Sequence, residues 1–139
     1  MTLRYLLDTN VISEPLRAAP SPAVLEKLRL NEEFLAISAI TWHELWFGCR
    51  RLPDSARRSA IESFLLAVIA PAMPILPYDE GAAAWHAAER ARLAAQGHTP
   101  PFADGQIAAI AHQHQLTLVT FNMADYQGFH EIPLEDWRS

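Results

Sequence analysis

The sequence predicts an α/β domain of three layers, in which helices cover both faces of a mainly parallel sheet of four or five short strands. Short apolar runs alternate with longer segments that carry apolar residues at helical spacing. These helical segments are long enough to cross over between parallel strands. The 139 residues are 50% hydrophobic and 19% charged, the balance of one globular domain over residues 1–139.

The expected strands and helices alternate along the chain. The strands, all short and apolar, cover residues 3–7, 34–38, 75–78 and 116–120, with a fifth near residue 132. The helices cover residues 11–17, 22–30, 41–51, 55–70, 80–97 and 102–114. The tail from residue 121 is otherwise expected to be irregular.

Short polar residues are expected to mark the helix ends. Asn10, Asp54 and Asp79 precede helical segments and are suited to accept hydrogen bonds from the first free backbone N–H groups. Ser21 followed by proline is a typical helix start. Gly97 is expected to end the alanine-rich helix, since glycine adopts the left-handed conformation that often follows a helix.

Composition excludes several classes of protein. The net charge of −5 argues against binding nucleic acid by bulk positive charge, although bound cations would reverse the local field. The single cysteine, Cys49, excludes an internal disulfide framework and fits a reducing, cytoplasmic compartment. The longest uncharged stretch, residues 64–78, is too short to cross a bilayer and contains prolines, and the N-terminus lacks the pattern of a secretory signal.

Four carboxylates are predicted to gather near the carboxyl ends of the strands, where open α/β sheets bind ligands. Asp8 follows the first strand, Asp125 lies shortly after the fourth, and Asp104 starts a helix that packs on the sheet. Glu44 has mostly apolar neighbours one turn away, so its carboxylate is expected to need a partner or a cation. Taken alone, each residue also fits a turn, a helix cap or an exposed side chain.

Carboxylates packed together repel one another, and a hard divalent cation removes that repulsion. Mg²⁺ prefers oxygen ligands and combines a few carboxylates with water and substrate phosphate. The residue types therefore favour metal-assisted hydrolysis of a phosphoester.

Four motifs that follow one another over nearly the whole chain resemble those of PIN-domain ribonucleases. They are Leu6–Glu14, the T-x-x-E-L-x-x-G pattern at residues 41–48, the A-D-x-x-I-A pattern at residues 103–108, and Thr120–Asn122 followed by Asp125 and Tyr126. Within these ribonucleases the chain resembles the VapC toxins of type II toxin–antitoxin pairs, in particular the FitB-like branch.

The resemblance implies an endoribonuclease that depends on Mg²⁺ or Mn²⁺ and cleaves single-stranded or structured RNA. It implies that Asp8, Glu44 and Asp104 ligate the metal directly or through water. Thr9 would hold the first carboxylate in place, and Asn10 would support its loop.

The fourth motif departs from the family pattern, which is usually acidic at the position of Asn122. Either Asp125 substitutes for that carboxylate, or Asn122 acts through its carbonyl oxygen, with Thr120 supporting the site. The departure leaves open whether one metal or two are bound.

The resemblance also implies a cognate antitoxin encoded next to the toxin, and a homodimer. Trp42, Trp46, Phe64, Leu65 and Val68 lie at helical spacing and could form the subunit interface, with ordinary core packing as the alternative.

Arginines near one helix junction, including Arg50 and Arg51, could hold the RNA backbone, with a solvated face as the alternative. Two other functions remain open at this point. One is a DNA nuclease with the same acidic site, and the other is a catalytically inactive interaction module.

Overall fold

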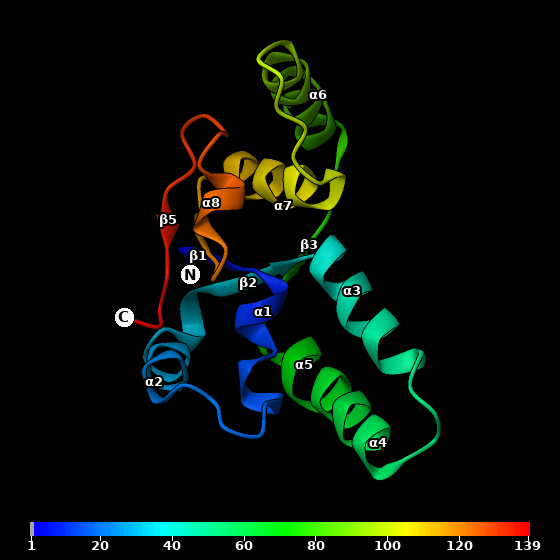
Figure 1. Cartoon of the computed structure of the whole chain (residues 1–139). Coiled ribbons are helices and arrows are strands. Elements are labelled where there is room, and N and C mark those ends of the chain that lie inside the picture. Colours follow the sequence, from blue (N-terminus) through cyan, green and yellow to red (C-terminus); the bar gives the residue numbers. More distant parts are fainter. Residues whose placement is uncertain (1) are drawn as a thin grey trace.

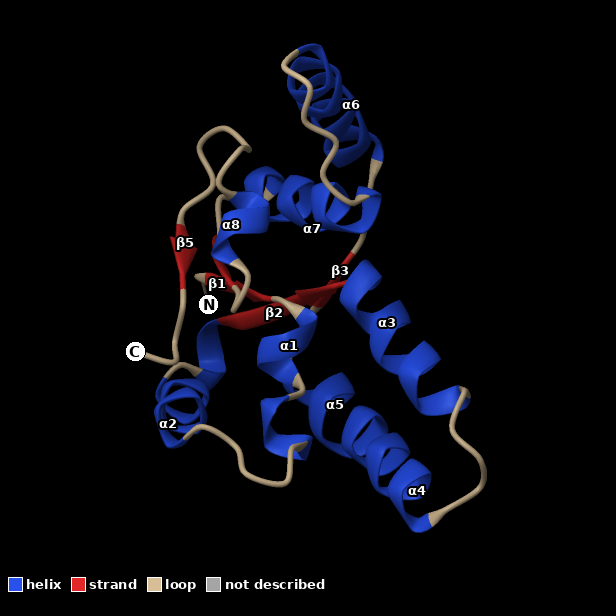
Figure 2. Ribbon diagram, viewed as in Figure 1, coloured by secondary structure: helices blue, strands red, loops and turns tan. Residues whose placement is uncertain are grey.

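The computed structural model describes residues 2–139 and shows a five-stranded parallel sheet between two layers of helices, which confirms the predicted fold class (Figures 1 and 2). The strands are β1 (Tyr5–Leu7), β2 (Leu35–Ser38), β3 (Ile75–Leu76), β4 (Thr117–Val119) and β5 (Leu134–Glu135). Their order in the sheet is β3-β2-β1-β4-β5.

The helices alternate with the strands along the chain. They are α1 (Thr9–Ile12), α2 (Pro22–Leu30), α3 (Ala39–Arg50), α4 (Ala56–Ser63), α5 (Ala70–Ala72), α6 (Glu80–Ala95), α7 (Phe102–Gln113) and α8 (Met123–Tyr126). Two short 3₁₀ turns, η1 (Glu14–Leu16) and η2 (Glu32–Phe34), and a π-helical segment, η3 (Phe64–Ile69), join them.

The central strand β1 divides the core in two because successive side chains point to opposite faces. Leu6 packs into the cluster beneath α6 and α7, whereas Leu7 packs into the cluster on the other face. Leu118 and Val119 of β4 repeat this alternation. Figure 2 shows α6, α7 and α8 on one side of the sheet and α1 to α5 on the other.

Two helix starts match the prediction because their caps are formed by adjacent residues. Ser21 accepts a hydrogen bond from the backbone N–H of Val24 at the start of α2. Asp79 accepts one from Ala82 at the start of α6, and Gly97, with φ of 81°, follows the end of that helix.

The predicted cap of the first helix is wrong. Asp8, rather than Asn10, is the N-cap of α1, and its side chain accepts a hydrogen bond from the N–H of Thr9. The helix is also shorter than predicted, since Pro15 has no N–H to continue it and the chain forms η1 instead.

The predicted cap at Asp54 is wrong as well. Ser55 caps α4 by accepting a hydrogen bond from the N–H of Arg58, while the exposed Asp54 carboxylate pairs with the Arg58 side chain at 3.3 Å. The predicted helix 55–70 is observed as α4, η3 and α5 in succession. Helix α8 lies in the tail that was expected to be irregular.

Among residues 2–139, none of the helices combines the length and the apolar character needed to cross a bilayer.

Candidate active site

Asp8 is a buried carboxylate at the carboxyl end of the central strand. Its side chain is 7% exposed, and its backbone N–H donates to the carbonyl of Val119 in β4. Its Oδ1 accepts the N–H of Thr9 at 2.8 Å, and its Oδ2 accepts the hydroxyl of Thr120 at 2.8 Å. These donors orient the carboxylate and compensate for its burial. Thr120 therefore lies where it supports Asp8.

Tyr126 links Asp8 to Asp104. Its buried hydroxyl lies 3.3 Å from Asp8 Oδ2 and 3.4 Å from Asp104 Oδ1, within donating distance of both. Burial, together with the two negative charges, raises the pKa of Tyr126, so the hydroxyl keeps its proton. Tyr126 lies in the fourth motif, but the sequence does not predict this role, because Tyr126 and Asp8 are 118 positions apart.

Asp104 lies in the first turn of α7, and its side chain is half-buried. Burial raises its pKa to about 6, and repulsion from Asp8, Asp125 and Glu44 adds to the increase. The hydrogen bond from Tyr126 works in the opposite direction. The four predicted carboxylates are therefore close enough for their charges to act on one another.

Glu44 is held at the edge of the site by Thr9, whose hydroxyl lies 2.8 Å from Glu44 Oε1 and 3.2 Å from Thr41 Oγ1. The prediction that Glu44 lies in an apolar patch is wrong. Its side chain is exposed, and Phe47, one turn further along α3, is 60% exposed. Thr9 thus contacts both carboxylates, Asp8 through its N–H and Glu44 through its hydroxyl.

The two candidates for the fourth position lie at the start of α8. Asp125 is exposed, and its charge contributes to the raised pKa of Asp104. Asn122 donates its backbone N–H to Thr120 Oγ1, but within residues 2–139 its side chain makes no hydrogen bond to these carboxylates. The side chain of Asn10 likewise forms no hydrogen bond in that part of the chain, and only its carbonyl oxygen accepts one, from Ser13.

The oxygen-rich set suits a hard divalent cation, since the pKa of Asp104 is raised first by burial and then by repulsion from the neighbouring carboxylates. In the described chain, however, no three Asp, Glu, His or Cys side chains are close enough to bind an ion on their own.

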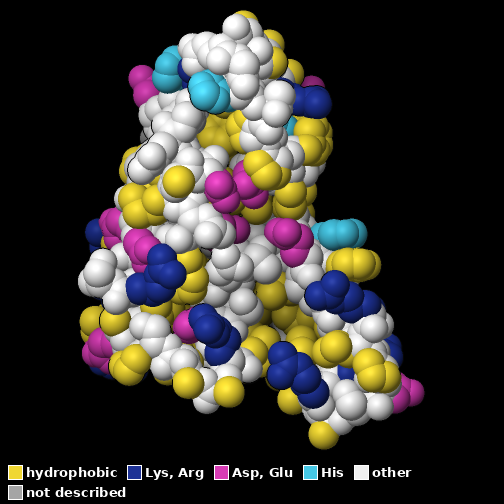
Figure 3. Space-filling view, in the orientation of Figure 1, with side chains coloured by type: hydrophobic (Ala, Val, Ile, Leu, Met, Phe, Trp, Pro, Cys, Tyr) yellow, Lys and Arg dark blue, Asp and Glu magenta, His cyan; other side chains and the backbone are white. Residues whose placement is uncertain are grey.

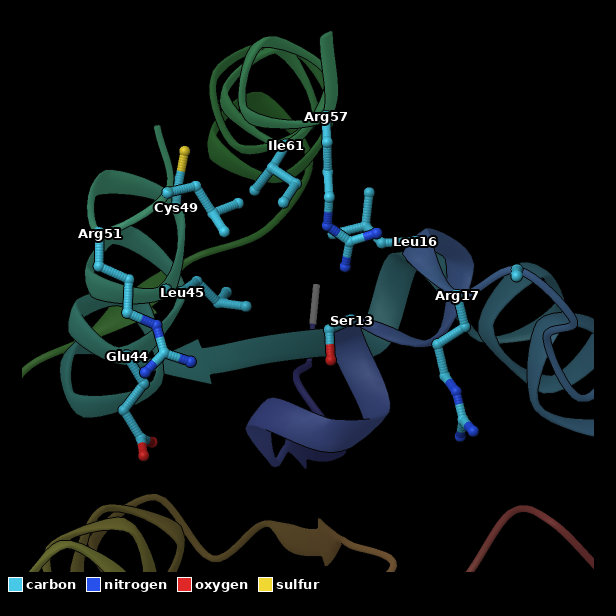
Figure 4. Close-up of a pocket in the computed structure, with 12 residues that line it drawn as sticks. Ser13, Leu16, Arg17, Glu44, Leu45, Cys49, Arg51, Arg57 and Ile61 are labelled. Atoms are coloured by element: carbon cyan, nitrogen blue, oxygen red, sulfur yellow. The ribbon is translucent and has the colours of Figure 1, made fainter. Parts of the chain in front are cut away.

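A groove opens beside Glu44 on the helical side of the sheet that carries α3 and α4 (Figure 4). Figure 3 shows acidic side chains at the centre of one face and basic side chains below them, over α3, α4 and the segment after α1. Arg51 lines this groove, whereas Arg50 does not.

The predicted interface residues separate into two groups. Leu65 is fully buried in the core, and Trp42, Trp46 and Phe64 pack against that core while partly buried. Val68 is 52% exposed. The alternative of core packing therefore holds for Leu65.

Comparison with known proteins places this site in a family. The model of the PIN domain matches residues 5–126. Toxin FitB of Neisseria gonorrhoeae is 43% identical over 120 residues, covering 83% of this chain and 85% of that protein. The tRNA(fMet)-specific endonuclease VapC of Shigella flexneri is 32% identical, covering 97% of this chain and 98% of that protein.

Solved structures agree with these relatives. The crystal structure of FitAcB from Neisseria gonorrhoeae superposes with a TM-score of 0.85 at 36% identity, covering 95% of this chain and 96% of that chain. The crystal structure of DNA-bound VapBC from Salmonella typhimurium superposes with a TM-score of 0.85 at 30% identity, covering 97% of this chain and 98% of that chain. The chain therefore belongs to the PIN-domain family, and its relatives within that family include the VapC and FitB toxins.

Proposed function

We propose that this chain is an endoribonuclease that hydrolyses phosphodiester bonds with Mg²⁺ or Mn²⁺ and acts as the toxin of a toxin–antitoxin pair. Relatives that cover nearly the whole chain are named VapC ribonuclease or tRNA(fMet)-specific endonuclease, which supports RNA as the substrate. The whole chain, residues 1–139, acts as one PIN domain in the cytoplasm.

The observation that carries the proposal is the link Asp8–Tyr126–Asp104, with the pKa of Asp104 raised to about 6. One tyrosine hydroxyl holds two carboxylates whose charges repel each other. A purely structural cluster would be more stable with an apolar or neutral residue at one of these positions. Carboxylates held together at such a cost are typical of functional sites, here a site that binds a cation.

Asp8 and Asp104 would hold the cation, which supplies Lewis-acid stabilisation of charge that develops on the phosphate. Asp8 is oriented by Thr9, Thr120 and Tyr126, so it needs little rearrangement to bind. A cation bound there would favour the ionised form of Asp104, whose pKa is raised in the metal-free chain. Glu44, exposed and held by Thr9, would accept or orient a water proton at the edge of the site.

Asp125 is our candidate for the fourth acidic position, since its charge reaches Asp104 and the side chain of Asn122 makes no contact with the cluster in residues 2–139. We expect Asp125→Asn to reduce cleavage at least tenfold and Asn122→Ala to change it less than threefold. A larger loss in Asn122→Ala than in Asp125→Asn would contradict this choice and assign the role to Asn122.

The partner is a cognate antitoxin. Structural neighbours above 25% identity include FitAB and VapBC complexes, which supports such a partner for this chain. We also propose a homodimer, with the exposed Val68 as part of the surface available for it.

Cleavage of an end-labelled RNA by the purified chain tests the proposal. We expect cleavage with Mg²⁺ or Mn²⁺, none with EDTA, and at least a hundredfold loss in Asp8→Asn and Asp104→Asn. Asp54→Asn is the matched control, because it removes an exposed carboxylate on the loop before α4. Cleavage that persists in EDTA or in Asp8→Asn would refute the assignment. A DNA strand of the same sequence, cut as fast as the RNA, would favour the DNA nuclease.

A further inference from the structure

The groove beside Glu44 is lined by three arginines that come from three separate elements. Arg17 follows η1, Arg51 follows α3, and Arg57 belongs to α4. The cavity has a volume of about 490 Å³, and Leu45 and Ile61 form part of its floor. Figure 4 shows the Arg57 side chain extending from α4 into this groove, which Glu44 borders at one end.

Two of these arginines lack a carboxylate partner. Across residues 2–139, neither Arg51 nor Arg57 has an Asp or Glu oxygen within 4.0 Å or a hydrogen bond from its guanidinium. The chain has 16 acidic residues and only 11 basic ones, so free carboxylates are plentiful. Glu44 borders the same groove, but within residues 2–139 it forms no ion pair with either arginine, so both guanidinium groups remain unpaired there.

Neighbouring side chains outside the groove restrain two of the three arginines, Arg51 and Arg17. The Arg51 guanidinium lies over the exposed ring of Phe47, 5.6 Å from its centroid, which favours one position of a long side chain. Arg17 is anchored by the buried carboxylate of Glu14, 3.3 Å from its guanidinium, while the rest of the Arg17 side chain stays exposed.

We propose that this groove binds the backbone phosphates of a single RNA strand next to the phosphate that is cleaved, with Arg51 and Arg57 forming the phosphate contacts and Arg17 extending them. The inference rests on the proposed nuclease function and names the part of the molecule that holds the substrate. A guanidinium binds phosphate oxygens in a bidentate manner and stays charged at every working pH.

A strand explains the arrangement better than a small anion does. The arginines lie beside a carboxylate of the candidate active site rather than inside it, so phosphates bound there belong to the same strand but not to the reacting position. The acidic centre repels phosphate until a cation is present, and the neighbouring groove supplies attraction that does not depend on that cation. Contacts of this kind recognise the backbone and not the base sequence.

Arg50 and Arg51 are adjacent in the sequence, but only Arg51 lines the groove. Arg50 lies outside it, over the ring of Trp46 at 4.9 Å and 4.0 Å from Glu62. Both side chains are exposed, and both stack on an aromatic ring one turn earlier. Arg50→Ala is therefore a matched control for Arg51→Ala.

The test is the salt dependence of RNA binding, measured by fluorescence anisotropy with a labelled, unstructured 12-nucleotide RNA. The full chain is used in EDTA, which prevents metal-dependent cleavage. Each phosphate contact contributes a slope of about 0.7 in a plot of log affinity against log salt for single strands. We expect Arg51→Ala and Arg57→Ala each to lower the slope by about 0.7 and the affinity about fivefold at low salt. Arg51→Lys, which keeps the charge, should retain the slope.

A slope unchanged in Arg51→Ala and Arg57→Ala, or lowered equally in Arg50→Ala, would overturn the proposal. Melting temperatures of all variants are recorded, and little change is expected because the three substituted side chains are exposed. Cleavage of the same RNA by the unsubstituted chain with Mn²⁺ is measured in parallel. Cleavage without a slope change refutes the groove alone, whereas a slope change without cleavage refutes the nuclease and leaves the groove as an RNA-binding surface.

Discussion

The acidic site should make the metal-free protein less stable at neutral pH than at mildly acidic pH, and Asp104→Asn should remove that cost. The pKa of Asp104 is raised in the folded chain from its ordinary value of 3.8 to about 6. Between these two pH values the folded state binds more protons than the unfolded state, so stability falls as pH rises through this range. Asparagine keeps an oxygen that can accept the hydrogen bond from Tyr126 but carries no charge.

The magnitude follows from the size of the shift. A pKa difference of about two units corresponds to about 3 kcal/mol of unfolding free energy, which is an upper bound. Asp104 is only half-buried, so solvent screening reduces the figure to about 1–2 kcal/mol. For a chain of this length, that corresponds to an increase of about 3–7 °C in the melting temperature of Asp104→Asn at pH 7.5.

The assay is thermal unfolding in EDTA between pH 4.5 and 7.5. The advantage of Asp104→Asn should grow up to about pH 6 and then stay constant. Adding Mn²⁺ should stabilise the unsubstituted chain more than the variant, because the cation binds the folded carboxylates. Asp136→Asn is a control of opposite sign. The Arg138 side chain holds the pKa of Asp136 below its ordinary value, so this variant should be less stable than the unsubstituted chain at pH 7.5. An Asp104→Asn variant that is equally or less stable throughout this pH range would refute the reasoning.

Three further substitutions test how the site is built. Gly105→Ala would place its Cβ against the His86 ring and should lower the unfolding free energy by about 1–3 kcal/mol in urea denaturation. An unchanged unfolding free energy would refute the close packing of α6 on α7. Gly48→Ala is its matched contrast, since nothing lies within 4 Å of the new Cβ and alanine favours a helix, so we expect a gain of about 0.5–1 kcal/mol in the same assay. Thr9→Val should remove the hydrogen bond to the exposed Glu44 and reduce RNA cleavage about tenfold, while the unfolding free energy changes by about 1 kcal/mol or less. Thr9→Ser keeps the hydroxyl and should cleave at nearly the unsubstituted rate. This role is contradicted if Thr9→Val cleaves as fast as the unsubstituted chain, or if Thr9→Ser is as slow as Thr9→Val.

The helix starts show how far local sequence signals reach. The beginnings of α2 and α6 were predictable because their caps, Ser21 and Asp79, bond to N–H groups three residues further on. At Asp54 and Ser55, two suitable cap residues are adjacent, and the choice depends on backbone conformation. Ser55 adopts the extended geometry that a cap requires, and Asp54 instead pairs with an arginine on the surface.

The convergence of the acidic site was partly predictable for a topological reason. In a parallel sheet the carboxyl ends of the strands share one edge, so residues that follow β1 and β4 had to lie near each other. Asp8 and Thr120 illustrate this, since Thr120 donates directly to the Asp8 carboxylate. Asp104 does not follow a strand, and it was predicted instead from the apolar residues after it, which indicate a helix that packs on the sheet.

The hydrogen bonds that join the carboxylates could not be predicted from the sequence. Tyr126 reads as an ordinary apolar residue of the tail, and only the fold of α8 brings its hydroxyl between Asp8 and Asp104. Glu44 was expected in an apolar patch from helical spacing, but that spacing does not show which face of α3 remains exposed. The hydrogen-bond partner and the exposure of these side chains depend on tertiary contacts, which local sequence patterns do not encode.

The acidic centre and the arginine groove place opposite charges side by side on one face of the molecule (Figure 3). Without a cation, the carboxylates oppose the approach of the very strand that Arg51 and Arg57 attract. A cation at Asp8 and Asp104 would remove this opposition, so it should raise the affinity for RNA. Because coupling between two ligands is reciprocal, bound RNA should raise the affinity for the cation by the same factor. The negative charge that is expected to destabilise the metal-free fold would thus make the binding of metal and of substrate depend on each other.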